Sequence, residues 1–355
     1  MKIIQLVFSV VFLIFSAVQT FGQKLNESQV IGSHNSYKSG MPVPILNYLK
    51  KINPRTAESL EYQHLPLSDQ LDLGLRNLEL DVFHDPHGGR FAKPKGLSML
   101  PEEFIYDQKG ELKEPGLKLF HVQDLDFQSH HLLFKNALLE LKNWSEQNPD
   151  HHPIFILINA KDGAIPSTIT PLPFSATALD SIDLEIRTHL GVEKIITPDL
   201  IRGDFESLES AVLAGKWPEL SSVRGKFLFV LDENEVKIKS YLSEKPGLQN
   251  AVLFVNLKEG NPEAGFRIIN DPVTNETYIQ ELVKKGYIIR TRADSDTREA
   301  RNNDYSKFEK AKSSGAQVIS TDYYIPSPLF PSTYQVDFEN RTFERSNPIL
   351  NPARE

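Results

Sequence analysis

Short apolar runs recur along the chain, and a stretch with helical spacing of apolar residues follows several of them. Some runs are apolar at every position, such as Phe-Ile-Leu-Ile at 155–158 and Phe-Leu-Phe-Val at 227–230. Continuous apolar runs of this length are typical of strands that are buried on both faces. We predict eight strands, at 30–33, 77–82, 118–121, 154–158, 227–231, 251–255, 287–291 and 318–321.

Helical patterns separate several of these strands. Apolar residues follow a 3.6-residue period over 132–144, 179–190 and 279–283, and Gly286 is a stop signal for the last of these helices. Eight strands alternating with helices predict an α/β fold, a single-domain TIM-like (β/α)8 barrel. A doubly wound open sheet is the structural alternative.

Two long segments interrupt the alternation, and both leave from the carboxyl ends of predicted strands. The segment 90–116 is rich in Pro, Gly and charge, and 165–174 is a shorter Pro-containing one. Parallel barrels build their active sites from loops at this face. We therefore expect long loops beside a site at the carboxyl ends of the strands.

The first residues resemble a secretory signal peptide. Lys2 precedes an apolar stretch at 3–18, and Gly22 offers a cleavage point before Gln23. We predict a signal peptide at 1–22 and a catalytic domain at 23–355, in a protein that is secreted or periplasmic. An uncleaved N-terminal anchor is the alternative.

Composition narrows the functional classes. The chain carries a formal charge of −8, which disfavours non-specific binding of nucleic acid. It contains no Cys, so disulfides, thiolate metal sites and Cys nucleophiles are excluded. Nothing in the sequence indicates an obligate protein partner.

Polar residues gather where the predicted strands end. These residues are His34, Asn35, Glu79, Asp81, His121, Asn159, Lys161, Asp162, Arg290, Arg292, Asp294 and Asp322. Because the carboxyl ends of parallel strands meet at one mouth of a barrel, we expect these side chains to lie close together.

Glu79 and Asp81 are candidate metal ligands. Side chains two residues apart on a strand share a face, so both carboxylates point into one barrel mouth. They repel each other there unless a cation lies between them. Oxygen ligands suit a hard cation, Ca²⁺ or Mg²⁺, and Asn35 offers a third oxygen. Pairing with Arg76 or Arg292 is the alternative.

His34 and His121 are candidates for a general acid/base pair. Histidine has the unperturbed pKa that suits proton transfer near neutral pH. Lys161, Arg290 and Arg292 could stabilise the charge of an anionic phosphodiester in its transition state. Ion pairs between these basic groups and the carboxylates remain the alternative.

The other histidines carry weaker signals. A pocket lined by His64 and Tyr62 is an alternative to a structural role for these residues, and we expect His84 and His87 to lie on a surface turn. His130, His131, His151 and His152 flank a predicted helix, and we expect them to face solvent.

Eight segments of the chain resemble the calcium-dependent phosphoinositide phospholipase C family of bacteria and fungi. They are Ile-Gly-Ser-His-Asn-Ser-Tyr at 31–37, Pro-Leu-Ser-Asp-Gln-Leu at 66–71, Leu-Glu-Leu-Asp-Val-Phe at 78–83, Trp-Ser-Glu-Gln-Asn-Pro at 144–149, Ile-Thr-Pro-Asp at 196–199, Ala-Val-Leu-Ala-Gly-Lys-Trp-Pro at 211–218, Arg-Thr-Arg-Ala-Asp-Ser-Asp-Thr at 290–297 and Ser-Gly-Ala-Gln-Val-Ile-Ser-Thr-Asp at 314–322.

The resemblance implies a secreted phosphodiesterase that cleaves the glycerophosphate ester of phosphoinositide-type lipids during transient contact with a membrane. It implies His34 as general base, His121 as general acid, and Ca²⁺ rather than Mg²⁺ bound by Asn35, Glu79 and Asp81. The family carries Glu where this chain has Asn159, so the resemblance implies Asn159 as a ligand without the charge of that Glu, and a weaker affinity for the metal. Alternatively, Asp294 or Asp162 would complete the shell. The alternatives are a glycerophosphodiester phosphodiesterase and a catalytically weakened barrel that binds phosphorylated head groups.

Overall fold

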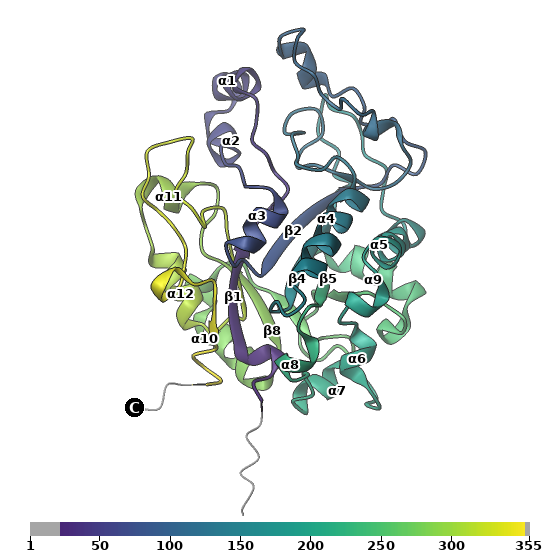
Figure 1. Cartoon of the computed structure of the whole chain (residues 1–355), viewed down its shortest axis with the longest axis vertical. Helices are drawn as coiled ribbons and strands as arrows, with labels where there is room; N and C mark the ends of the chain where they lie inside the picture. Colours follow the sequence, from purple (N-terminus) through teal and green to yellow (C-terminus); the bar gives the residue numbers. More distant parts are fainter. Residues whose placement is uncertain (1–21, 352–355) are drawn as a thin grey trace, which may run out of the picture.

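The computed structural model describes residues 22–351, so the predicted signal peptide lies outside the described residues apart from residue 22. Eight strands run parallel in two sheets (Figure 1). The first sheet contains β2 (Asn77–Phe83), β4 (Ile154–Ala160), β5 (Phe227–Leu231) and β6 (Leu253–Val255). The second contains β7 (Phe266–Ile268), β8 (Ile288–Arg292), β9 (Val318–Thr321) and β1 (Ser28–Ser33).

The two sheets meet at both edges. Asn256, just after β6, forms a parallel bridge with Phe266 of β7. At the other edge, the Arg76 amide donates to the Ile31 carbonyl at 2.9 Å, which brings the start of β2 against β1. These contacts bring the eight parallel strands into the predicted TIM-like barrel, with helices outside.

The helices lie between consecutive barrel strands. They are α1 (Val43–Ile52), α2 (Pro54–Ser59), α3 (Leu67–Asp72), α4 (Phe134–Gln147), α5 (Ala176–His189), α6 (Pro198–Arg202), α7 (Leu208–Leu213), α8 (Leu220–Val223), α9 (Glu235–Glu244), α10 (Pro272–Lys285), α11 (Arg298–Asn302) and α12 (Ser306–Ser313). Short 3₁₀ turns occupy Leu25–Glu27, Lys95–Met99, Glu111–Lys113, Val192–Lys194, Pro246–Leu248 and Glu339–Arg341. Within residues 22–351, no helix is long and apolar enough to cross a membrane.

The three predicted helical patterns correspond to α4, α5 and α10. The Asp271 carboxylate accepts from the Val273 amide at the start of α10, and Gly286 ends the helix with φ 103°. Glycine adopts this left-handed conformation at little steric cost, which explains its use as a stop. All three helical predictions are confirmed.

Two predictions about strands are wrong. The segment 118–121 does not enter the barrel, because β3 (Lys118–Leu119) pairs antiparallel with the end of β2. The missing barrel strand is β7, whose three residues are too few to show a period. No α-helix separates β6 from β7, so the expected alternation fails there. A further strand, β10 (Glu344–Ser346), pairs antiparallel with β1.

The strand register fixes which residues face the barrel interior. Asn77, Glu79 and Asp81 of β2 lie opposite Phe155, Leu157 and Asn159 of β4. Paired positions share a face, so apolar side chains fill the lower barrel and polar ones lie toward the carboxyl ends of the strands.

Gly32 allows β1 to approach β2 closely. A Cβ atom at this position would lie 1.9 Å from the Asn77 carbonyl oxygen, far inside van der Waals contact. The absence of a side chain at Gly32 therefore keeps β1, and His34 that follows it, beside the carboxylates of β2.

The prediction that His151 and His152 face solvent is wrong, because both are buried just before β4. Nε2 of His151 lies 2.9 Å from Ser145 Oγ, and its ring packs against Trp144 and Phe227. These partners belong to the last turns of α4 and to the first residue of β5. The two residues therefore help to close the core at this end. His130 and His131 are half-buried.

Burial of His151 makes stability depend on pH. Burial lowers the pKa of His151 to about 4, whereas an unfolded histidine has its ordinary value near 6.5. Between these values the unfolded chain binds a proton that the folded protein does not, so stability is full above about pH 6.5 and falls toward pH 4. We expect His151→Gln to flatten this dependence by about 1 kcal/mol per pH unit in urea unfolding. Equal slopes for the two proteins would contradict the assignment.

Candidate active site

The carboxyl ends of β1, β2, β4, β8 and β9 bring the predicted site residues together. His34 follows β1, Glu79 and Asp81 belong to β2, and Asn159 lies opposite Asp81 on β4. Arg290 lies on β8 and faces Val318 of β9 in the register. The polar residues predicted at these strand ends therefore share one mouth of the barrel.

Glu79 is buried and paired. One oxygen accepts from Arg290 Nη2 at 2.6 Å, and the other accepts from Asn159 Nδ2 at 3.1 Å. His34 Nε2 lies 3.6 Å from the same oxygen that Asn159 contacts. Burial lowers the pKa of Arg290, and the nearby carboxylates of Glu79 and Asp232 oppose this effect. The contact joins a β2 carboxylate to a β8 guanidinium across the barrel.

Asp81 has one paired and one unpaired oxygen. Its Oδ2 lies 3.0 Å from Lys161 Nζ, and the carboxylate raises the pKa of that lysine. Oδ1 is buried and has no hydrogen-bond partner among residues 22–351. Buried carboxylate oxygens normally have a partner, so Oδ1 fits a cation ligand. Asn35, which is buried nearby and donates to Tyr62 at 2.6 Å, offers an amide oxygen.

A carboxylate orients His34. Nδ1 of His34 lies 2.9 Å from Asp322 Oδ1, and Arg292 Nη2 lies 3.2 Å from Asp322 Oδ2. Burial would raise the pKa of Asp322, but His34 and Arg292 hold it well below the ordinary value. This pairing leaves Nε2 of His34 as the ring nitrogen directed away from Asp322.

His121 has a similar partner that the sequence did not reveal. Its Nδ1 lies 2.8 Å from Asp126 Oδ2, and Lys38 Nζ lies 3.1 Å from Asp126 Oδ1. Burial would raise the pKa of Asp126, yet Lys38 and His121 hold it below its ordinary value. Asp126 lies in a turn rather than at a strand end, so the strand pattern gave no signal for it.

Tyr62 connects the two imidazoles. The centroid of its ring lies 6.1 Å from that of His34 and 6.5 Å from that of His121. Tyr62 and His64 also line a pocket of about 280 Å³. His34 and His121 therefore lie against one phenol ring at the mouth.

Two acids are placed away from the Glu79–Asp81 pair. Asp294 accepts from the Thr321 hydroxyl, and from the Asp322 amide at 2.9 Å, so both of its oxygens support the end of β9. Burial and the neighbouring Asp322 raise the pKa of Asp294 to about 7. Asp162 forms an ion pair with Lys237 at 2.8 Å. Their contacts give neither acid a place beside Asp81 Oδ1.

Asp232, directly after β5, is a further acid that the sequence analysis missed. Burial raises its pKa to about 7, Arg290 opposes the rise, and Glu79, Glu233 and Asp81 add to it. The charges of Arg290, Glu79 and Asp81 therefore act on the Asp232 carboxylate. Its position immediately after a fully apolar strand was the signal that could have identified it.

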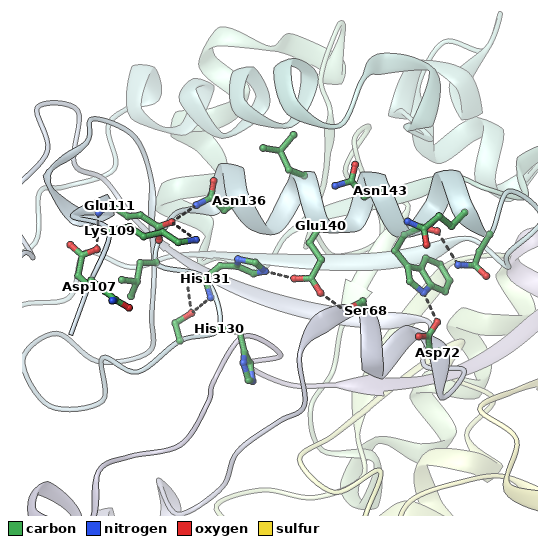
Figure 2. A pocket seen from close by; sticks show the side chains of 17 residues that line it. Ser68, Asp72, Asp107, Lys109, Glu111, His130, His131, Asn136, Glu140 and Asn143 are labelled. Atoms are coloured by element: carbon green, nitrogen blue, oxygen red, sulfur yellow. Dashed lines mark hydrogen bonds and ion pairs between the residues drawn. The ribbon is translucent and has the colours of Figure 1, made fainter. Parts of the chain in front are cut away.

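A separate hollow of about 1000 Å³ lies outside the barrel between α3, α4 and the loop at 107–111 (Figure 2). His131 forms an ion pair with Glu140 of α4 inside it, and Glu140 also accepts from the Ser68 amide at 2.8 Å. None of the predicted catalytic or metal-binding residues lines this hollow. Within residues 22–351, no three His, Asp or Glu side chains form a metal-binding group.

A TIM-like barrel with these groups at its mouth defines a phosphodiesterase of the phospholipase C type. The family model described as "Phosphoinositide phospholipase C, Ca2+-dependent" matches residues 23–348, and the chain belongs to this family.

Solved structures support the fold. A calcium-dependent phosphoinositol-specific phospholipase C from Pseudomonas sp. is 14% identical, with a TM-score of 0.57, over 92% of this chain and 96% of that one. A Ca²⁺-dependent phosphatidylinositol-specific phospholipase C from Streptomyces antibioticus is 17% identical, with a TM-score of 0.54, over 88% and 99%. Identities this low establish the fold alone. A search of curated proteins gives no match.

The Lys38–Asp126 pair offers a test of the site's electrostatic construction. Both side chains are fully buried, so Asp126→Ala leaves an uncompensated ammonium in the interior. We expect a loss of about 3–5 kcal/mol in the free energy of unfolding in urea. Lys38→Met combined with Asp126→Leu should recover most of it, because both charges are then absent. A double variant as unstable as Asp126→Ala would contradict this account.

Proposed function

We propose that the protein is an exported, Ca²⁺-dependent phosphodiesterase that cleaves the glycerophosphate ester of phosphoinositide-type lipids. One observation carries the proposal: two imidazoles, each held by a buried carboxylate, lie against Tyr62, and one of them, His34, lies 3.6 Å from the Glu79 carboxylate. Two ring nitrogens of this kind can remove one proton and supply another.

The residues fit a calcium ion. Asp81 Oδ1 is an unpaired buried oxygen, and Asn35 and Glu79, whose oxygens already accept from Arg290 and Asn159, would add further hard oxygen ligands. Water and substrate would supply the rest of the shell. When bound, the ion would neutralise a phosphate oxygen and lower the pKa of a neighbouring hydroxyl. Asn159 donates to Glu79, so in this chain it orients a ligand carboxylate instead of supplying one.

The histidines handle the protons. Asp322 holds His34 by Nδ1, which leaves Nε2 to take a proton from the head-group hydroxyl next to the phosphate. The resulting oxygen attacks phosphorus, and the bond from phosphorus to the glycerol oxygen breaks. Asp126 holds His121 by Nδ1, so its Nε2 donates a proton to that leaving oxygen. The products are diacylglycerol and a cyclic inositol phosphate, which water can open.

The basic residues complete the chemistry. Lys161, whose side chain is 36% exposed, can leave Asp81 for the phosphoryl group. Arg292 lies 3.3 Å from His34 Nε2 and 3.2 Å from Asp322, and it would turn from Nε2 toward the phosphate to stabilise the negative charge that develops on the phosphate oxygens. Arg290 is fully enclosed by Glu79, Asn270 and Ser320, so we assign it to positioning Glu79.

We expect His34→Ala and His121→Ala each to lower turnover of phosphatidylinositol by about 10²–10⁴-fold, because each removes a proton-transfer group. His87→Ala, at an exposed turn, should retain wild-type turnover and serves as the matched control. The measurement is release of inositol phosphate with excess Ca²⁺ and with a chelator. A folded His34→Ala variant with wild-type turnover would refute the assignment.

The same assay separates the rival functions. A glycerophosphodiester phosphodiesterase would prefer glycerophosphoinositol to intact phosphatidylinositol. A barrel that only binds head groups would bind Ca²⁺ in calorimetry without cleaving either substrate. The observation that favours this rival is Asn159, which donates a hydrogen bond to Glu79 and supplies no carboxylate of its own.

Exposed apolar residues support transient contact with a membrane. Val43 and Ile52 of α1 are 66% and 60% exposed, and Ile105 in the segment 90–116 is 69% exposed. Both regions project from the same end of the barrel (Figure 1). Apolar side chains around a site opening are suited to the interface of a bilayer.

We expect Ile105→Glu to reduce sedimentation with phosphatidylcholine vesicles that contain phosphatidylinositol, because a charged residue disfavours the apolar interface. Turnover of a soluble inositol phosphodiester should not change. Leu184→Glu, at a 62% exposed position on the outside of α5, is the control. Equal losses of vesicle binding in both variants would argue against a membrane-facing rim.

A further inference from the structure

His64 is a buried histidine whose ring has no hydrogen-bond partner. Its side chain is completely enclosed, yet neither Nδ1 nor Nε2 forms a hydrogen bond with any group in residues 22–351. Buried polar groups in folded proteins normally have partners, and a group without one destabilises the folded state. A histidine at this position therefore makes the protein less stable than an apolar ring of similar shape would.

The position of the ring does not depend on its nitrogens. The His64 amide donates to the Lys38 carbonyl at 2.8 Å, and the His64 carbonyl lies 2.8 Å from His130 Nε2. The ring itself packs against Tyr62 and Tyr324, at centroid distances of 5.7 and 5.5 Å. Backbone contacts and aromatic packing would hold a phenyl ring in the same place, so the fold gives no reason for an imidazole.

Nε2 of His64 faces the carboxylate that holds His34. It lies 3.8 Å from Asp322 Oδ1, the same oxygen that lies 2.9 Å from His34 Nδ1. The other oxygen of Asp322 accepts from Arg292 Nη2 at 3.2 Å. Burial lowers the pKa of His64 to about 4, so the ring is neutral near pH 7 and has one donor and one acceptor nitrogen. An unprotonated Nε2 would set its lone pair against the carboxylate, which assigns the hydrogen to Nε2.

We propose that His64 is a positioning residue for the Asp322–His34 pair, and that its Nε2–H keeps Asp322 Oδ1 directed at His34. The inference rests on the proposed function, because it presupposes that His34 transfers the proton. At 3.8 Å the N–H attracts the carboxylate without forming a hydrogen bond, so His34 remains the partner of Oδ1. Without His64 the carboxylate would turn toward the guanidinium of Arg292, and His34 would lose the contact that sets its orientation.

Turnover of phosphatidylinositol and the melting temperature of the full chain test the proposal together. We expect His64→Phe to raise the melting temperature by about 2 °C, because the unpartnered nitrogens are removed, and to lower turnover about 10-fold. His64→Gln retains an N–H near the position of Nε2 and should recover most of the turnover. His64→Phe combined with Asp322→Asn should be no slower than Asp322→Asn alone, because His64 acts through Asp322.

His151→Phe is the matched control. His151 is also buried, but both of its ring nitrogens have partners, so this variant should melt at a lower temperature and keep wild-type turnover.

Wild-type turnover in His64→Phe would overturn the inference and leave the proposed function intact. A lower melting temperature in His64→Phe, with a loss of turnover that His64→Gln does not recover, would also overturn it, because the ring would then have a structural role. Losses that multiply in the double variant would count against it in the same way. Absence of turnover by the wild type would overturn both the inference and the proposed function.

Discussion

The ion pair between Glu79 and Arg290 is the interaction on which the arrangement of the mouth depends. It crosses the barrel from β2 in one sheet to β8 in the other, and both side chains are almost completely buried. Two charges in the interior are tolerated only when each satisfies the other, so neither can move alone. The pair thereby fixes one layer of side chains inside the barrel. His34, Asp81 and Asn159 lie above this layer.

Two Asp–His contacts orient the histidines of the site. Asp322 comes from the end of β9, whereas Asp126 comes from a turn after β3, yet each holds a histidine by Nδ1. When a carboxylate holds Nδ1 of a histidine, Nε2 is the ring nitrogen left to exchange a proton or bind another group. The barrel thus supplies one histidine from a strand end and the other from an excursion, and Tyr62 holds them near each other.

Much of this arrangement could be predicted from the sequence, because strand ends of a parallel barrel converge. His34, Glu79, Asp81 and Asn159 follow this rule. The rule failed where pairing is decided by distant contacts: 118–121 is apolar enough for a barrel strand but lies antiparallel on β2, and β7 is too short to show a pattern. Asp126 was missed because it lies in a turn, where the strand-end rule does not apply. Asp232 was missed although it directly follows the apolar strand β5, a position that the rule covers.

The close approach at Gly32 has a consequence for how this enzyme could be altered. The joint between β1 and β2 has no room for even one methyl group, and His34, the proposed general base, lies two residues beyond it. New substrate preferences would have to arise in the loops, such as the long segment between β2 and α4. Laboratory evolution that randomises loops and spares this joint would sample altered pockets while the position of His34 beside β2 stays undisturbed.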